Sequence, residues 1–150
     1  MTADPPRSLR LLHVEDNSGD VRLVAEALKD TGRDHTIVVA SDGAEALDYL
    51  HQRAPYTAAP RPDLILLDLN LPKKSGLEVL AEIKSDTRLW HIPVVVFTTS
   101  SSPFDISRAY GLHASCYVTK PADLDDLFRV VGIIEKFWLN TAKLPQPQGT

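Results

Sequence analysis

Five short apolar runs, each followed by a segment with helical periodicity, constrain the fold of this chain more than any other feature. Most of the runs are rich in β-branched residues or uninterrupted in their apolar character, as strands are, and the segments between them carry apolar residues at helical spacing. Strands that alternate with helices in this way favour one parallel sheet with helices on both faces. The expected strands are residues 9–14, 36–40, 64–67, 93–97 and 116–119.

Helix-start residues delimit the segments between these strands. Asp42 with Glu45 forms a capping-box pattern, and Pro103 directly after Ser102 fits a proline in the first helical position behind a serine cap. The helices are therefore expected over residues 21–31, 42–52, 75–85, 103–110 and 123–140.

Composition limits the domain count and the classes of partner. A chain of 150 residues that is 43% hydrophobic and 24% charged suits one domain, here residues 8–140, with polar, proline-containing tails at 1–7 and 141–150. A net charge of −4 without a basic run gives no reason to bind nucleic acid or an anionic membrane. There is no signal-peptide or membrane-spanning pattern, so a cytoplasmic location is expected. Few residues follow Asn140, so we expect no attached output domain.

Polar residues stand at the carboxyl ends of four expected strands, the edge at which parallel α/β sheets carry their chemistry. Each has an ordinary explanation alone; Asp68, for example, could simply end a strand and cap a turn. Together, three carboxylates at one edge would raise one another's pKa unless a cation shared the site, and oxygen ligands favour Mg2+. The residues expected to converge are Glu15, Asp16, Asp68, Asn70, Thr98 and Lys120.

These side chains are suited to holding a phosphoryl group. Asp68 can attack phosphorus to form an acyl phosphate, while Lys120 and Mg2+ stabilise the developing charge and Thr98 donates a hydrogen bond to a phosphoryl oxygen. The sequence lacks the glycine-rich loops that bind nucleotides. The phosphoryl group is therefore expected to come from a partner protein or a small activated donor.

The motifs at residues 14–17, 67–72, 97–100 and 117–121 resemble those of the receiver domain of two-component response regulators, over residues 9–140. The resemblance implies a flavodoxin-like (βα)5 fold with strand order 2-1-3-4-5. It also implies a phosphoacceptor signalling protein that is phosphorylated by a histidine kinase and is not an enzyme in its own right. Residues 14–28, 70–74 and 137–138 are similar to single-domain regulators paired with bacterial phytochromes.

The resemblance also assigns roles. Asp68 corresponds to the phosphoacceptor, and Glu15, Asp16, Asp68 and the Asn70 carbonyl correspond to the Mg2+ ligands. Thr98 and Tyr117 correspond to the switch pair, and Lys120 to the lysine that contacts the phosphate, with a cis bond to Pro121. The acid pair is Glu-Asp instead of the commoner Asp-Asp, and Thr99 stands where receivers often carry a smaller residue. The second departure leaves the lifetime of the phosphate open.

The last helix carries two apolar stripes, although one sheet can bury only one of them. The stripe expected to face the sheet is Leu124, Leu127, Phe128, Val131, Ile134 and Trp138. Val130, Ile133 and Phe137 form the other stripe, which would be exposed on a monomer as interfaces are. We therefore expect a homodimer that forms through this helix.

Three other functions compete with this interpretation. A haloacid-dehalogenase-like phosphatase would also use Asp68 as nucleophile, but it needs a second aspartate where Asn70 stands. A flavin-binding module would need a phosphate loop where Glu15 and Asp16 would repel the phosphate. A degenerate receiver would lack some of the chemical positions, and here every one is filled.

Overall fold

Five parallel strands form one sheet in the order β2-β1-β3-β4-β5 in the computed structural model, which describes residues 8–145. The expected fold and strand order are confirmed. The elements are β1 Arg10–Val14, α1 Ser18–Asp30, β2 Thr36–Ala40, α2 Gly43–Leu50, β3 Leu64–Leu67, α3 Gly76–Ser85, β4 Val94–Thr98, α4 Pro103–Gly111, β5 Cys116–Thr119, α5 Leu124–Lys136 and a π-helical turn, η1, Phe137–Thr141.

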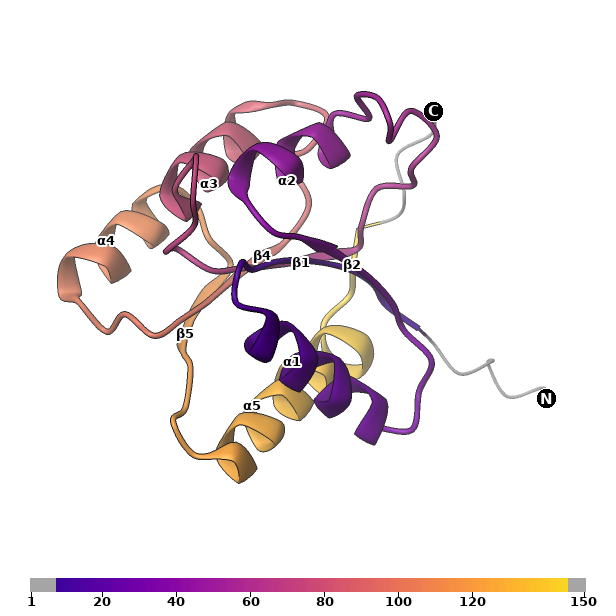
Figure 1. Ribbon diagram of the computed structural model, residues 1–150, viewed down its shortest axis with the longest axis vertical. Coiled ribbons are helices and arrows are strands. Elements are labelled where there is room, and N and C mark those ends of the chain that lie inside the picture. The colour runs from indigo at the N-terminus through magenta and orange to yellow at the C-terminus, as the bar shows by residue number, and fades with distance from the viewer. Residues whose placement is uncertain (1–7, 146–150) are drawn as a thin grey trace.

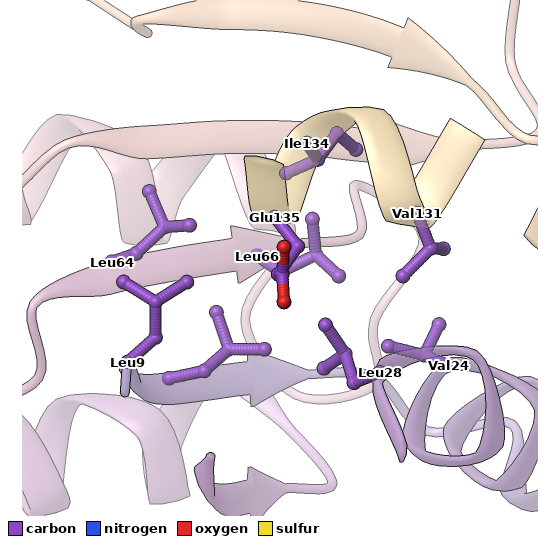
Figure 2. Close-up of a pocket in the computed structure, with 9 residues that line it drawn as sticks. Leu9, Val24, Leu28, Leu64, Leu66, Val131, Ile134 and Glu135 are labelled. Atoms are coloured by element: carbon purple, nitrogen blue, oxygen red, sulfur yellow. The ribbon is translucent and has the colours of Figure 1, made fainter. Parts of the chain in front are cut away.

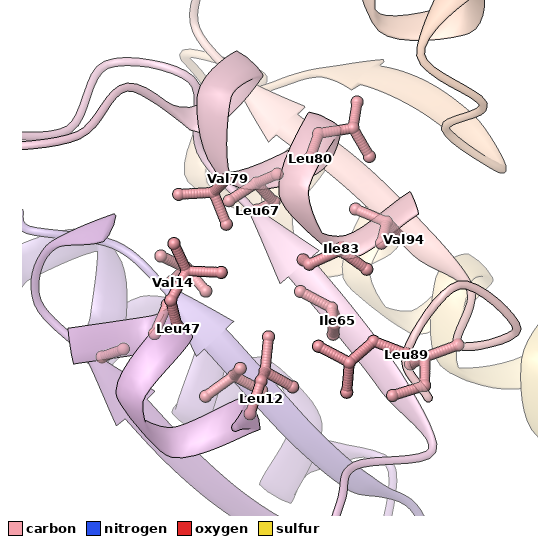
Figure 3. Close-up of a cluster of buried hydrophobic side chains, with 14 of the residues drawn as sticks. Leu12, Val14, Leu47, Ile65, Leu67, Val79, Leu80, Ile83, Leu89 and Val94 are labelled. Atoms are coloured by element: carbon pink, nitrogen blue, oxygen red, sulfur yellow. The ribbon is translucent and has the colours of Figure 1, made fainter. Parts of the chain in front are cut away.

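The sheet separates two layers of helices. Helices α1 and α5 pack together on one face, and α2, α3 and α4 lie on the other (Figure 1). β3 is buried on both faces: Leu64 and Leu66 join the core under α1 and α5, whereas Ile65 and Leu67 join the core under α2 and α3 (Figure 3). Burial on both faces explains why the apolar run of β3 shows no alternation with polar residues.

Side-chain caps begin the helices at the places that the sequence predicts. The Asp42 carboxylate accepts a hydrogen bond of 2.7 Å from the Glu45 N–H, and Ser102 caps the helix that begins at Pro103. The return half of the Asp42–Glu45 box differs from its usual form, because the Glu45 carboxylate accepts from Ser41. Each cap satisfies an N–H group that the helix leaves without an internal partner.

Replacing the α2 cap, Asp42→Ala, is expected to lower the free energy of unfolding by about 1 kcal/mol. The Glu45 N–H holds the pKa of Asp42 below its usual value. The contribution of the ionised Asp42 cap to the free energy of unfolding is therefore fully present above the pKa of an unfolded aspartate, about 3.9. It is lost as the pH falls through the lower folded-state pKa. Urea unfolding at several pH values measures both effects. Asp48→Ala, on the same helix, is the control, and an equal loss there would contradict a capping role.

Helix α5 and the η1 turn bury most of the stripe that the sequence predicts, since Phe128, Ile134 and Trp138 pack partly buried against the core. Leu127 and Val131 are buried as predicted, but Leu124 is 53% exposed, and its prediction is wrong. Leu124 is the first residue of α5, and the first turn of this helix is exposed to solvent. Nearer the other end of the helix, the buried position belongs to Glu135, which is only 3% exposed.

Glu135 is the buried acid in a cluster of polar side chains under α5. The Leu9 N–H donates to His35 Nδ1 at 2.8 Å, which places the ring proton on Nε2, where it faces the Glu135 carboxylate at 2.9 Å. Arg33 donates to the other carboxylate oxygen at 3.2 Å. A small apolar cavity of about 20 Å³ lies between α5, α1 and the sheet. Figure 2 shows the Glu135 carboxylate among the residues that line it. Burial of the carboxylate is tolerated because both of its oxygens have partners.

None of the helices within residues 8–145 combines the length and apolar character that crossing a membrane requires.

Candidate functional site

The parallel register brings the polar residues together at one edge of the sheet. Val14 pairs with Leu67 across β1 and β3, so the residues that follow, Glu15 and Asp68, lie next to each other. On the other side, Thr98 pairs with Thr119, so Lys120 follows at the same edge. The structure therefore brings Glu15, Asp68 and Lys120 together at one edge, because all the strands run in the same direction.

Lys120 is the centre of this site. Its ammonium group donates hydrogen bonds to Glu15, to Asp20 at 2.8 Å and to Asp68 at 2.8 Å. The Lys120 side chain is only 5% exposed, and those of Glu15 and Asp68 are similarly buried. An ammonium group has three N–H donors, so these three carboxylates use its full capacity.

The electrostatics of the site follow from burial and from this shared lysine. Burial and the neighbouring Asp68 raise the pKa of Glu15 to about 7, although the Lys120 contact acts against them. Burial also tends to raise the pKa of Asp68, but Lys120, Thr98 and the Asn70 N–H outweigh it, so the pKa of Asp68 lies below its usual value. Burial lowers the pKa of Lys120, and its carboxylate partners more than reverse this. The direction of this shift keeps Asp68 ionised at neutral pH, which is the form that a carboxylate nucleophile requires.

Thr98 and Tyr117 lie on neighbouring strands beside the acidic cluster. The Thr98 hydroxyl is buried and makes no hydrogen bond of normal length to any residue of the described range 8–145, yet it lies close enough to Asp68 to favour the charged carboxylate. Tyr117 is half-buried, and its hydroxyl donates to the Ser100 carbonyl at 2.8 Å. Thr98 thus has an unused donor next to the carboxylate, while Tyr117 is tied to the β4–α4 loop.

The remaining residues of the expected metal site line its solvent side. Asp16 and Asn70 are exposed, and the Asn70 N–H donates to Asp68 Oδ1 at 3.1 Å. Among residues 8–145, no three acidic, histidine or cysteine side chains are grouped as metal ligands, because the Lys120 ammonium lies between the carboxylates. The donor chemistry still fits a hard cation, since the oxygen donors carry more negative charge than one lysine neutralises.

Three residues at this site escaped the sequence reasoning. Asp20 has the clearest signal, because an acid in the first turn after β1 must lie near the carboxyl edge of the sheet. Gly76 lies against the backbone of Asp68: a Cβ added there would stand 2.2 Å from the Asp68 carbonyl oxygen. His13 is buried, and burial followed by the charge of Lys120 lowers its pKa to about 4, so the imidazole is neutral. Nothing in the pattern of β1 distinguishes His13 from a core residue.

The bond between Lys120 and Pro121 is trans, because the one cis peptide within residues 8–145 precedes Pro55. The expectation of a cis bond at Pro121 is wrong, and the trans form is the intrinsically favoured one for a bond to proline.

Comparison with known proteins gives consistent matches along nearly the whole chain. A family model described as the response regulator receiver domain matches residues 11–132. Response regulator Rcp1 of Synechocystis sp. is 51% identical over 143 residues, which are 95% of this chain and 96% of that protein.

Solved structures agree with the sequence matches. The phosphorylated cyanobacterial phytochrome response regulator RcpA superposes with a TM-score of 0.90 at 54% identity, covering 93% of this chain and all of that one. The Mn2+-bound form of Rcp1 gives a TM-score of 0.88 at 51% identity, covering 92% of this chain and 99% of that one. One relative is thus phosphorylated, and another binds a divalent cation.

Proposed function

The chain belongs to the response regulator receiver domain family, and from this premise we propose that Asp68 accepts a phosphoryl group from a histidine kinase and that the protein then signals by contact with other proteins. Family membership makes the chain a phosphoacceptor signalling protein rather than an enzyme, which favours this function over the phosphatase alternative. The observation that carries the proposal is the ionised Asp68 carboxylate, hydrogen-bonded to Lys120 at 2.8 Å.

The proposed reaction is a direct transfer. A carboxylate oxygen of Asp68 forms a bond to phosphorus, the bond from phosphorus to the donor breaks, and the leaving group departs with the electron pair. Lys120 stabilises the charge on the transferred oxygens, and Thr98, whose hydroxyl has no strong partner, donates to one of them. The donor is a phosphohistidine or a small acyl phosphate.

Magnesium fits the solvent side of the same site. Glu15, Asp16, Asp68 and the Asn70 carbonyl are the groups that would hold Mg2+, since they supply the oxygen ligands that this cation prefers. When bound, the cation would neutralise charge on the phosphoryl oxygens. The Mn2+-bound form of Rcp1 supports a divalent cation in this chain too.

The test is to incubate the protein with Mg2+ and acetyl phosphate or a histidine kinase. We expect a phosphate that is stable in acid and labile in base, together with complete loss of labelling in Asp68→Asn. This variant keeps the shape of the side chain and removes its nucleophilic charge. Labelling that persists in Asp68→Asn would reject the assignment of the phosphoacceptor.

The switch proposed for this receiver involves Thr98 and Tyr117. If Thr98 moves to meet the phosphate, it leaves space into which the Tyr117 ring can turn, and the Tyr117 bond to Ser100 must then break. Because Ser100 lies in the loop that leads to α4, the N-terminal end of that helix would shift with the ring. The extent of the shift is bounded by the contacts that the phosphate makes in one state and not in the other.

The proposed phosphoryl donor is a histidine kinase of the phytochrome type. This choice follows from the similarity to RcpA, which is a cyanobacterial phytochrome response regulator, and to Rcp1. Transfer from a purified phytochrome kinase to this chain, compared with transfer from an unrelated histidine kinase, would test it.

A homodimer through α5 is the proposed oligomeric state. Ile133 is 55% exposed and Phe137 47% exposed, while Val130 is half-buried and packs partly against the core. Association would remove the two exposed side chains from water. The outer side of α5 and of the η1 turn therefore carries exposed apolar side chains, as interfaces do.

Equilibrium ultracentrifugation is expected to give a dimer at tens of micromolar and a monomer for Ile133→Lys. Trp90→Lys is the control, because Trp90 is an apolar side chain that is 57% exposed and lies outside α5. This variant should remain a dimer. A monomeric wild-type protein, with and without a phosphate mimic, would remove the proposed dimer.

A further inference from the structure

The third carboxylate on Lys120, that of Asp20, has no role in the proposed reaction. Asp20 lies in the first turn of α1, and its Oδ2 is 2.8 Å from the Lys120 ammonium nitrogen. Its position is fixed by Asn17, whose N–H donates to Glu15 at 3.2 Å and whose side chain accepts from the Asp20 N–H at 2.9 Å. Asp20 therefore belongs to the same hydrogen-bonded group as Glu15 and Lys120.

The three carboxylates differ in how easily they can release the lysine. The Glu15 side chain is 1% exposed and would be left buried without its cation, which is costly. Asp68 itself becomes bonded to phosphorus. The Asp20 side chain is 30% exposed, so water can replace the ammonium as its partner. Asp20 is the partner that Lys120 can give up at least cost.

We propose that Asp20 is a positioning residue that competes with the phosphoryl group for Lys120 and thereby slows the phosphorylation of Asp68. All three N–H donors of the ammonium are taken by carboxylates, so a phosphoryl oxygen obtains one only by displacing a carboxylate. This competition for Lys120 sets the rate at which a phosphoryl donor phosphorylates Asp68. This inference depends on Asp68 being the phosphoacceptor.

The test is the rate of labelling by acetyl phosphate. In this reaction Asp68 bonds to phosphorus, the bond from phosphorus to the bridging oxygen breaks, and acetate leaves with the electron pair. Asp20→Ala is expected to raise the rate roughly three- to tenfold, because one lysine donor is free from the start. Glu26→Ala removes a carboxylate from the same helix at an exposed position without a lysine contact, and its rate should stay within about twofold of wild type.

Two further measurements separate the possible failures. Proton exchange of the Lys120 ammonium group, followed by NMR without any phosphate donor, should be faster in Asp20→Ala than in wild type; unchanged exchange would show that the contact is absent. In a Lys120→Ala background the effect of Asp20→Ala should shrink below about twofold. An equal acceleration there would attribute the effect to charge alone and overturn the proposal. Labelling that survives Asp68→Asn would instead reject the phosphoacceptor assignment.

Discussion

Lys120→Ala is expected to slow labelling of the protein by acetyl phosphate about a hundredfold, since it removes the cation that stabilises the transferred phosphoryl oxygens. The same substitution is expected to lower the free energy of unfolding by about 3 kcal/mol, because it leaves buried carboxylates without their shared partner. Timed labelling and urea unfolding measure the two effects separately. A Lys120→Ala protein that is labelled at the wild-type rate would exclude Lys120 from the reaction.

A second substitution distinguishes stability from reactivity in that variant. Adding Glu15→Gln to Lys120→Ala removes the most deeply buried of the acids left without a cation, so part of the lost free energy of unfolding should return. Labelling should stay slow, because the glutamine supplies no cation for the phosphoryl group. Recovery of both quantities together would mean that the slow labelling had arisen from unfolding alone.

Gly76→Ala is the other substitution with a large expected effect. The new Cβ would stand 2.2 Å from the Asp68 carbonyl oxygen and 2.6 Å from the Leu69 Cα, and both of these atoms belong to the backbone. Because no flexible side-chain end can move aside, the segment that carries Asp68 must shift. We expect the free energy of unfolding to fall by about 3 kcal/mol, and labelling to slow roughly tenfold or more because the nucleophile is displaced.

Gly132→Ala is the matched control for this change. Gly132 lies inside α5, and a Cβ added there meets nothing within 4 Å. Alanine in a helix interior is more favourable than glycine by roughly 0.5–1 kcal/mol, so this variant should be slightly more stable and should be labelled normally. If Gly76→Ala behaves like Gly132→Ala, the close approach to Asp68 has no functional consequence.

Much of the fold and most of the candidate site could be predicted from the sequence. The Leu64–Leu67 run signals a strand buried on both faces, and the helix starts are marked by caps such as Asp42 and Ser102. Once the strands are parallel, every strand ends at the same edge. The positions of Asp68 and Lys120 beside each other therefore follow from topology, although 52 residues separate them in the chain.

Residues whose role depends on a particular contact could not be assigned in this way. Leu124 fits the apolar spacing of α5 but is exposed, whereas Glu135 breaks that spacing and is buried in contact with His35 and Arg33. Helical periodicity gives the direction of a side chain, but it does not say whether another element lies opposite. The requirement for glycine at position 76 is likewise invisible without the approach of the Asp68 backbone.

The sequence by itself determined the order of the strands and helices and the edge where the acidic residues, Thr98 and Lys120 meet, because hydrophobic periodicity is a local property of the chain and strands that alternate with helices run parallel. Only the tertiary structure decided which carboxylates share the hydrogen bonds of the Lys120 ammonium group. Its contact with Asp20 depends on how α1 is placed against the end of β5, and side-chain packing sets that distance, which no spacing in the sequence encodes.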